Sequence, residues 1–212
     1  YGAMTDGNHY LSVAVGAASL SRSSTYYPYY NVCVGYGTGT SIYSGDGNVL
    51  LGHNVNTSGT SDQYGVAVGH QSMGTHYGVA IGYQAQNQVD DGSDYNICIG
   101  YRAGYDTAGG DTNIFIGKDC GRGQSTSQRN IGIGLNTFYE LTSGTRNTSA
   151  GDLSGRSITS AEDNTFYGSS SGYGVTTGDK NTLIGQNAGY TQLTSTADAI
   201  TTGSNNTCIG FE

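Results

Sequence analysis

The densest group of chemically capable side chains in the sequence is acidic. Asp90, Asp91 and Asp94 lie within five residues of one another, whereas the other acidic residues are scattered. Two carboxylates held across a cleft can hydrolyse a glycosidic bond, and several carboxylate oxygens on one loop can bind calcium. The cluster stands in a polar stretch, which favours a solvated turn. A polysaccharide hydrolase and a calcium site remain the alternatives.

Two histidines form the other candidate group. His53 and His70 are 17 residues apart and each follows a glycine, so in a repeating structure their imidazoles would be neighbours able to share a metal. No cysteine or carboxylate accompanies them at a matching spacing, and stacked rings are the favoured interpretation. Phosphate-binding loops, nucleophile elbows and HExxH motifs are absent from the sequence. We therefore expect no enzymatic activity, no cofactor and no bound metal.

The element that must position these side chains is a repeated pentapeptide, Asn-apolar-x-apolar-Gly. Its glycines are separated by 19, 17, 17, 13, 18, 17, 17, 17, 17, 17 and 25 residues. The clearest copies begin at seven asparagines: Asn31, Asn48, Asn96, Asn113, Asn130, Asn181 and Asn206. A unit of about 17 residues with apolar residues in alternation is typical of a solenoid built from short strands.

The repeat predicts an all-β fold, a β-solenoid or β-roll of about twelve coils with a period of mostly 17 residues. At about 4.8 Å per coil the rod would be roughly 55 Å long. No linker or change of composition divides the chain, so residues 1–212 are expected to form one repeat domain. The pattern also continues across the two ends, which suggests a segment of a longer array or a unit that stacks end to end.

Equivalent positions in successive coils should lie in columns along the rod. We expect the apolar pairs, such as Val32 and Val34 or Ile114 and Ile116, to fill the coil interior. The asparagines should form a structural ladder of amides. Residues three after each glycine are small, and should face a narrow interior. The residues after five successive glycines should stack as an aromatic ladder: Tyr36, His53, His70, Tyr83 and Tyr101.

The middle residue of the pentapeptide is expected to face outward, because alternation places it opposite the apolar pair. It is mostly apolar, and an exposed apolar stripe along a rod needs a cover. We therefore predict that the chain assembles with itself, as a homotrimer or an end-to-end filament, with a monomeric solenoid as the alternative. The candidate interface residues are Cys33, Leu50, Cys98, Phe115, Phe166, Leu183 and Cys208.

Four cysteines are present, and three of them share this middle column. Cys33, Cys98 and Cys208 are several coils apart, too far for a disulfide within one chain. Cys120 belongs to the column of small residues. We interpret all four as small buried apolar side chains, while a bond between copies of one cysteine across an oligomer axis stays open.

Composition excludes several classes of partner. The formal net charge is −8, with 8 basic and 16 acidic residues, so neither nucleic acid nor an anionic membrane is an expected ligand. No run of 18 apolar residues is present to span a membrane. With 36 glycines, one proline and no tryptophan, the chain is rich in turns and poor in large core residues.

Loops where the period lengthens are the candidate recognition sites. The first such loop carries the candidate binding residues Tyr26, Tyr27, Tyr29 and Tyr30, which could stack on sugar rings of a surface glycan or fold back over the rod. The second, after Gly185, is rich in Ser and Thr. Three Asn-x-Ser/Thr sequences give candidate glycosylation sites at Asn56, Asn147 and Asn205, although Asn147 also belongs to the asparagine ladder.

The segments Asn96-Ile-Cys-Ile-Gly-Tyr-Arg-Ala-Gly104 and Asn181-Thr-Leu-Ile-Gly-Gln-Asn-Ala-Gly189 resemble known repeats. They are similar to the glycine-rich arrays of bacteriophage tail fibres and, in pattern, to the head domains of trimeric autotransporter adhesins. The resemblance extends over nearly the whole chain and implies an architecture without a defined ligand. It implies a trimeric shaft exposed outside the cell, at the cell surface or on a virion.

Three classes of function follow. The preferred prediction is a structural component of an extracellular or virion fibre that contacts a surface glycan or host receptor through its loops. The second is a ligand-binding or ice-binding solenoid, because Thr148, Thr165, Thr182 and Thr207 form a column that could match an ice lattice. That column replaces residues expected in the core, so we expect it to face inward. A tailspike-type hydrolase is the third.

Overall fold

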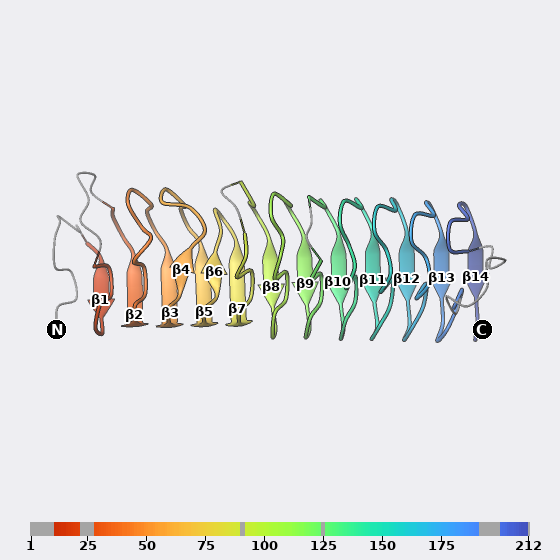
Figure 1. Cartoon of the computed structure of the whole chain (residues 1–212), viewed down its shortest axis with the longest axis horizontal. Coiled ribbons are helices and arrows are strands. Elements are labelled where there is room, and N and C mark those ends of the chain that lie inside the picture. Colours follow the sequence, from red (N-terminus) through yellow and green to blue (C-terminus); the bar gives the residue numbers. More distant parts are fainter. Residues whose placement is uncertain (1–10, 22–27, 90–91, 124–125, 191–199, 212) are drawn as a thin grey trace.

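Short parallel strands lie side by side in sequence order and form an elongated rod (Figure 1). The structure is a computed structural model that describes residues 11–21, 28–89, 92–123, 126–190 and 200–211. Strands and turns account for the assigned elements, and the described residues contain no helix. The prediction of an all-β solenoid with a period of about 17 residues is confirmed.

One sheet of twelve strands runs the length of the rod, and each strand with the turn and loop that follow it forms one coil. Its strands are β1 (Val13–Val15), β2 (Val32–Tyr36), β3 (Val49–His53), β5 (Val66–His70), β7 (Val79–Tyr83), β8 (Ile97–Ile99), β9 (Ile114–Ile116), β10 (Ile131–Ile133), β11 (Thr148–Ala150), β12 (Thr165–Tyr167), β13 (Thr182–Ile184) and β14 (Thr207–Ile209). A second, two-stranded sheet joins β4 (Asn56–Thr57) and β6 (Met73–Gly74).

Every neighbouring pair in the large sheet is parallel and pairs equivalent residues of the repeat. Ile97 pairs with Ile114, and Ile114 pairs with Ile131. The register is the same where the repeats differ in length: Thr182 pairs with Thr207 across the 25-residue unit. Extra residues are therefore accommodated outside the strands, and the columns expected from the sequence exist.

The glycine that ends each pentapeptide is required by backbone geometry. At Gly117 φ is +136°, a region that side chains with a Cβ rarely adopt. A Cβ on Gly117 would also collide with the carbonyl oxygen of Gly134 in the next coil. The same positive φ and the same collision recur at the glycines from Gly16 to Gly185. Close stacking of the turns thus explains why the repeat is anchored on glycine.

The asparagines form the ladder that was predicted. Asn130 shows the pattern: its Nδ2 donates to Oδ1 of Asn113 (3.1 Å) and to the carbonyl of Gly144 (2.9 Å). Its Oδ1 accepts hydrogen bonds from the backbone N–H and the Nδ2 of Asn147. The contact recurs between successive asparagines from Asn96 to Asn206, and once between Asn31 and Asn48. These buried amides tie adjacent coils together inside the rod.

The predicted orientation of the strand residues is wrong: the middle residue faces inward and the apolar pair faces outward. Cys33, Leu50 and Phe115 are fully buried, whereas Val13 and Val15 are 50% and 55% exposed. Alternation assigns residues to two faces without saying which is inside. The asparagine identifies the inner face of the strand, because its ladder is buried in the interior. The middle residue lies two positions after the asparagine and therefore on the same face.

The interior is narrow, as the small-residue column predicted. Each of these residues is at most 2% exposed: Ser19, Thr38, Ser72, Ala85, Ala103, Cys120, Thr137, Ser154, Ser171 and Ala188. Larger apolar side chains enter from the strand centres and from the far loops. Two clusters result, one of Leu20, Cys33, Ile42, Leu50, Val55, Ala67, Ala80 and Ala85, and a second running from Cys98 to Ala188 that includes Phe115, Phe138 and Phe166.

Interior volume is shared between the strand centre and the fourth residue after the anchor glycine. In the β9 coil Phe115 fills the strand centre and Gly121 occupies the turn, where a Cβ would overlap the Phe115 ring. In the next coil the sizes are exchanged: Gly132 is at the strand centre and Phe138, with φ of 54°, is in the turn. In these two coils one large side chain therefore fills the same space, from the strand in one and from the turn in the other.

Candidate functional site

The outward residues of the strands form the main candidate surface, because none of the described segments covers it. Four positions of each repeat contribute columns: the residue before the asparagine position, the two residues of the outer pair, and the residue after the glycine. We call this surface in the β1, β2, β3, β5, β7 and β8 coils the N-terminal face. Its columns are Leu11, Tyr30, Gly47, Tyr64, Tyr77 and Tyr95; Val13, Val32, Val49, Val66, Val79 and Ile97; Val15, Val34, Leu51, Val68, Ile81 and Ile99; and Ala17, Tyr36, His53, His70, Tyr83 and Tyr101.

One edge of this face is the predicted aromatic ladder, which the structure confirms. Ring centroids lie 5.3 Å apart between Tyr36 and His53, 4.8 Å between His53 and His70, 5.3 Å between His70 and Tyr83, and 5.2 Å between Tyr83 and Tyr101. Interplanar angles of 9° to 14° make the rings stack face to face. Their edges point to solvent, and their faces are occupied by one another.

A second aromatic ladder lies along the opposite edge and was not predicted. Tyr64, Tyr77 and Tyr95 stack at centroid distances of 5.5 Å and 5.1 Å, each with φ near +55°. The unusual backbone directs the ring out of the loop and alongside the strand face. The sequence signal was available, since all three tyrosines occupy the position before the asparagine column. The N-terminal face is therefore a valine and isoleucine strip with aromatic borders.

In the β11 to β14 coils the first two of these positions are polar throughout, whereas the third is Ala150, Tyr167, Ile184 and Ile209 and the fourth is polar except for Phe211. We call this region the C-terminal face. Thr148, Thr165 and Thr207 are exposed and Thr182 is half-buried, which corrects the expectation that this column points inward. Arg146 contacts Asp163 (2.6 Å) and Glu162 (2.7 Å) on the surface. Hydrogen bonds from Arg146 lower the pKa of the Asp163 carboxyl and raise the pKa of the guanidinium. This face presents charges and hydroxyls to water beside a column that includes the exposed Tyr167, Ile184 and Ile209.

Arginine and tyrosine alternate along another stripe that sequence analysis missed. The fifth residue after the glycine is Tyr105, Arg122, Tyr139, Arg156 and Tyr173 in successive coils. Guanidinium groups lie over neighbouring rings: Arg122 is 5.3 Å and Arg156 is 5.0 Å from the Tyr139 ring centroid. Glu140 and Asp119 form ion pairs with these arginines. The arginines of this stripe thus contact rings and carboxylates on neighbouring coils, and these contacts stabilise the stack of coils.

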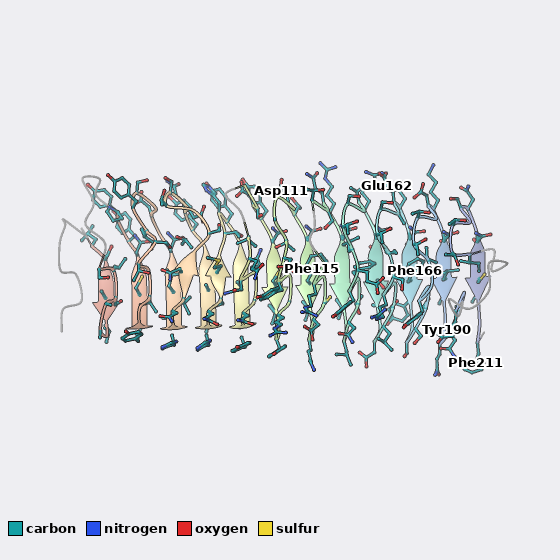
Figure 2. The ribbon with its side chains drawn as sticks, in the orientation of Figure 1. Asp111, Phe115, Glu162, Phe166, Tyr190 and Phe211 are labelled. Atoms are coloured by element: carbon teal, nitrogen blue, oxygen red, sulfur yellow. The ribbon has the colours of Figure 1, made fainter. Side chains whose placement is uncertain are left out.

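The predicted interface residues are not at the surface. Cys33, Leu50, Cys98, Phe115 and Leu183 are fully buried, Phe166 is 1% exposed, and Cys208 is partly buried against the interior cluster. Figure 2 shows Phe115 and Phe166 at mid-height of the rod, while Asp111 and Glu162 lie at one edge and Tyr190 and Phe211 at the other. The prediction of these residues as an oligomer interface is wrong, since they fill their own coils.

The predicted tyrosine cluster is only partly described. Tyr26 and Tyr27 lie outside the described residues. Tyr29 and Tyr30 are 37% and 63% exposed, and their rings are tilted at 40° with centroids 6.1 Å apart. The backbone N–H of Tyr29 donates to the Asp46 carboxylate (2.6 Å) in the next coil, which fixes the end of the loop. Tyr30 joins the first column of the N-terminal face.

The three glycosylation candidates differ in accessibility. Asn147 is fully buried, with its Nδ2 donating to Asn130 and to the carbonyl of Ala161, so the folded chain offers no attachment point there. Asn56 is half-buried and its Oδ1 accepts hydrogen bonds from Thr40 and Ser41. Asn205 is exposed. Asn205 is therefore the accessible one of the three.

The cysteines are free thiols, and Cys33, Cys98 and Cys120 are buried. Burial raises the pKa of the Cys33 thiol to about 12 and raises the pKa of Cys98 and of Cys120 as well. Such thiols are protonated at neutral pH and are poor nucleophiles and metal ligands. Their interpretation as small apolar side chains agrees with this burial.

The acidic cluster gives no assembled site in the part of the chain that is described. Asp90 and Asp91 lie outside it, and the backbone N–H of Asp94 donates to the Asp111 carboxylate (2.9 Å) of the next coil. Among the described residues, no group of three or more His, Cys, Asp or Glu side chains could hold a metal ion. His53 and His70 stack with each other and with their neighbours along the ladder.

Comparison with known proteins supplies no relative: no family model, no curated protein and no solved structure matches the chain. Across the described ranges there is also no helix long and apolar enough to cross a membrane. The function therefore has to be argued from the rod and its surfaces.

Proposed function

We propose that the chain is a structural component of an extracellular or virion fibre, either the shaft or a head segment. The observation that supports this most directly is the unbroken in-register stack of twelve strands, bonded internally by the asparagine ladder. Coils that are nearly interchangeable give a stiff rod of about 55 Å. Such a rod holds two ends apart, and its coils contact only their neighbours.

The location of the protein in its source tests this role. Antibodies raised against the folded chain should decorate filaments or fibres on intact cells or virions in electron micrographs, and negative staining of the purified chain should show rods. Antibody signal confined to the cell interior would contradict the proposal. Self-association, as a homotrimer or a filament, belongs to the same proposal.

Contact with a surface glycan or receptor is assigned within this proposal to the loop that carries Tyr29 and Tyr30. The Tyr30 ring is 63% exposed and tilted at 40° to the Tyr29 ring, so it is accessible for stacking on a sugar ring. A glycan array probed with the chain and with Tyr30→Ala tests the assignment. Binding that is unchanged in Tyr30→Ala would place recognition elsewhere.

Ice binding is the second candidate, and one observation favours it. The threonine column of β11 to β14 faces outward and is in register, with Thr148 paired to Thr165 and Thr165 paired to Thr182. Regular hydroxyls on a flat face are a possible match to an ice surface. Inhibition of ice recrystallisation that is lost in Thr165→Lys would support this function over a fibre. A chain without any effect on ice growth would remove it.

A further inference from the structure

The N-terminal face is free of ionic side chains. None of its 24 column positions is Asp, Glu, Lys or Arg, although the whole chain carries 24 such residues. Four of the twelve outer-pair residues are exposed, namely Val13 (50%) and Val15 (55%) in the first strand and Val34 and Ile81 (37% each) farther along, and the other eight are half-buried. The tyrosines of the two bordering ladders are 40% to 58% exposed. An apolar surface of this kind is costly to leave in water.

Two of the same coils have small side chains at their strand centres. Strand centres in β5 and β7 are Ala67 and Ala80, whereas Phe115, Phe166 and Leu183 fill the centres of β9, β12 and β13. The β5 and β7 strands therefore place their larger apolar side chains outside and their smaller ones inside, whereas Leu50 fills the centre of β3. The distribution is that of a sheet whose outer face belongs to a second core, built between molecules.

The size of the face agrees with this interpretation. Six strands extend about 29 Å along the rod, and seven residues across extend about 20 Å, which gives on the order of 600 Å² of flat area. The projecting side chains make the accessible area larger. A stable interface buries about 800 Å² from each partner, and the largest apolar patch of an ordinary monomer is about 300–600 Å².

We propose that the N-terminal face packs against the N-terminal face of another copy of this chain. Each column of the face places one side chain in every coil, so two copies of the face have the same spacing between side chains. The two sheets can therefore pack face to face at about 10 Å, with the side chains of one copy between those of the other. The protein has a net charge of −8, and this face is where two copies can approach without burying an ion. The C-terminal faces, with Arg146, Asp163 and Lys180, stay in water.

This inference rests on the proposed structural role, because it names the partner that a fibre subunit would use. The site of self-association is then the outer pair of each strand, and not the middle column that the sequence analysis predicted. The aromatic ladders then border the contact and exclude water from the valine and isoleucine strip at its centre. A partner with a charged surface fits poorly, because the face offers no ion to pair with it.

A matched pair of lysine substitutions tests the proposal. Ile81 and Ile184 occupy the same strand position, in β7 and β13, and each is 37% exposed. Light scattering coupled to size exclusion should give the unmodified chain a mass that is a multiple of 22.0 kDa. Ile81→Lys should reduce the mass to that of one chain, and Ile184→Lys should leave the multiple intact.

Two results would overturn the proposal: an unmodified chain of 22.0 kDa at tens of micromolar, or equal masses for Ile81→Lys and Ile184→Lys. Circular dichroism of each variant separates lost assembly from lost folding. If Ile81→Lys unfolds, Tyr36→Glu provides the second test, because that ring is 58% exposed at the edge of the face. Monomeric rods in micrographs would contradict self-association and leave the fibre role standing. Antibody labelling confined to the cell interior would contradict the fibre role and leave self-association standing.

Discussion

The two ends of the rod share one backbone path and differ most in the side chains on their outer faces. In the coils of β1 to β8 the outer face is apolar and aromatic, and the interior holds Ala67, Ala80 and Ala85 together with Leu20, Ile42, Leu50 and Val55. In the coils of β11 to β14 the outer face carries threonines and charges, and Phe166 and Leu183 fill the interior. A solenoid can therefore place its apolar side chains on either side of one strand, because the backbone hydrogen bonds are the same in both cases.

The buried amides differ between the ends in the same way. Seven asparagines from Asn96 to Asn206 form an unbroken ladder, while the β1 to β7 coils have only the pair Asn31 and Asn48. Gly65 and Gly78 stand at the equivalent positions of the β5 and β7 coils. The coils from β8 onward are thus joined by more buried amide hydrogen bonds than the coils before it.

Removing a large side chain from the C-terminal interior should have the largest effect. Phe166→Ala would place an alanine at the strand centre, as in the β7 coil. The β7 coil has a larger residue in its turn to fill the space, and the coil of the variant would not. We expect a loss of about 3–5 kcal/mol in the free energy of unfolding, measured by denaturant titration. Tyr167→Ala, at a position that is 65% exposed, is the control and should change stability little. Equal losses would contradict the inward orientation of the strand centre.

The asparagine ladder gives the next largest effect. Asn130→Ala would remove the donor to Gly144 and the acceptor of the Asn147 backbone N–H, at a cost of about 2–4 kcal/mol. Asn48→Ala, at the end of the short ladder, should cost about 1 kcal/mol less because its Oδ1 accepts only from Gly65 in the following coil. Thermal unfolding of both variants would compare the two regions. A larger loss at Asn48 would reverse the ranking proposed for the two ends.

A double-mutant cycle tests the sharing of interior volume between strand and turn. Gly132→Phe alone overfills a coil whose turn already holds Phe138, and Phe138→Gly alone leaves a cavity. The double variant should restore the arrangement of the preceding coil, with a coupling free energy of about 1–3 kcal/mol in favour of the pair. Additive losses would show that the two positions do not compete for one space.

The smallest expected effect concerns the buried thiols. Because burial raises the pKa of Cys33 from 9.0 to about 12, a neutral alkylating reagent should leave it unmodified in the folded chain. In the unfolded chain this thiol ionises from about pH 9 upward, so its contribution to stability is complete below pH 9 and is lost as the pH rises toward 12. Mass spectrometry after timed alkylation measures the protection. Rapid modification of Cys33 at pH 7.5 would indicate that the N-terminal interior opens.

Much of the architecture could be predicted from the sequence because it is local and repeated. The glycine spacing gave the coil, and the asparagine, small-residue and His53–His70 columns all occur where they were expected. The candidate surface was predicted less well, since alternation alone cannot distinguish inside from outside. The tyrosine ladder at Tyr64, Tyr77 and Tyr95 was missed because a left-handed residue before the strand is not evident from its type.

The period, the register and the members of every column follow from the sequence alone, because each coil repeats a short pattern that must stack on its neighbour. Which column forms the core is evident only from the folded coil. The choice depends on how the coil closes: the asparagine amides need partners that a dry interior supplies, and the residue two positions later must follow them inside. The valine and isoleucine pair, alternating with them, is then left as the outer face of the rod.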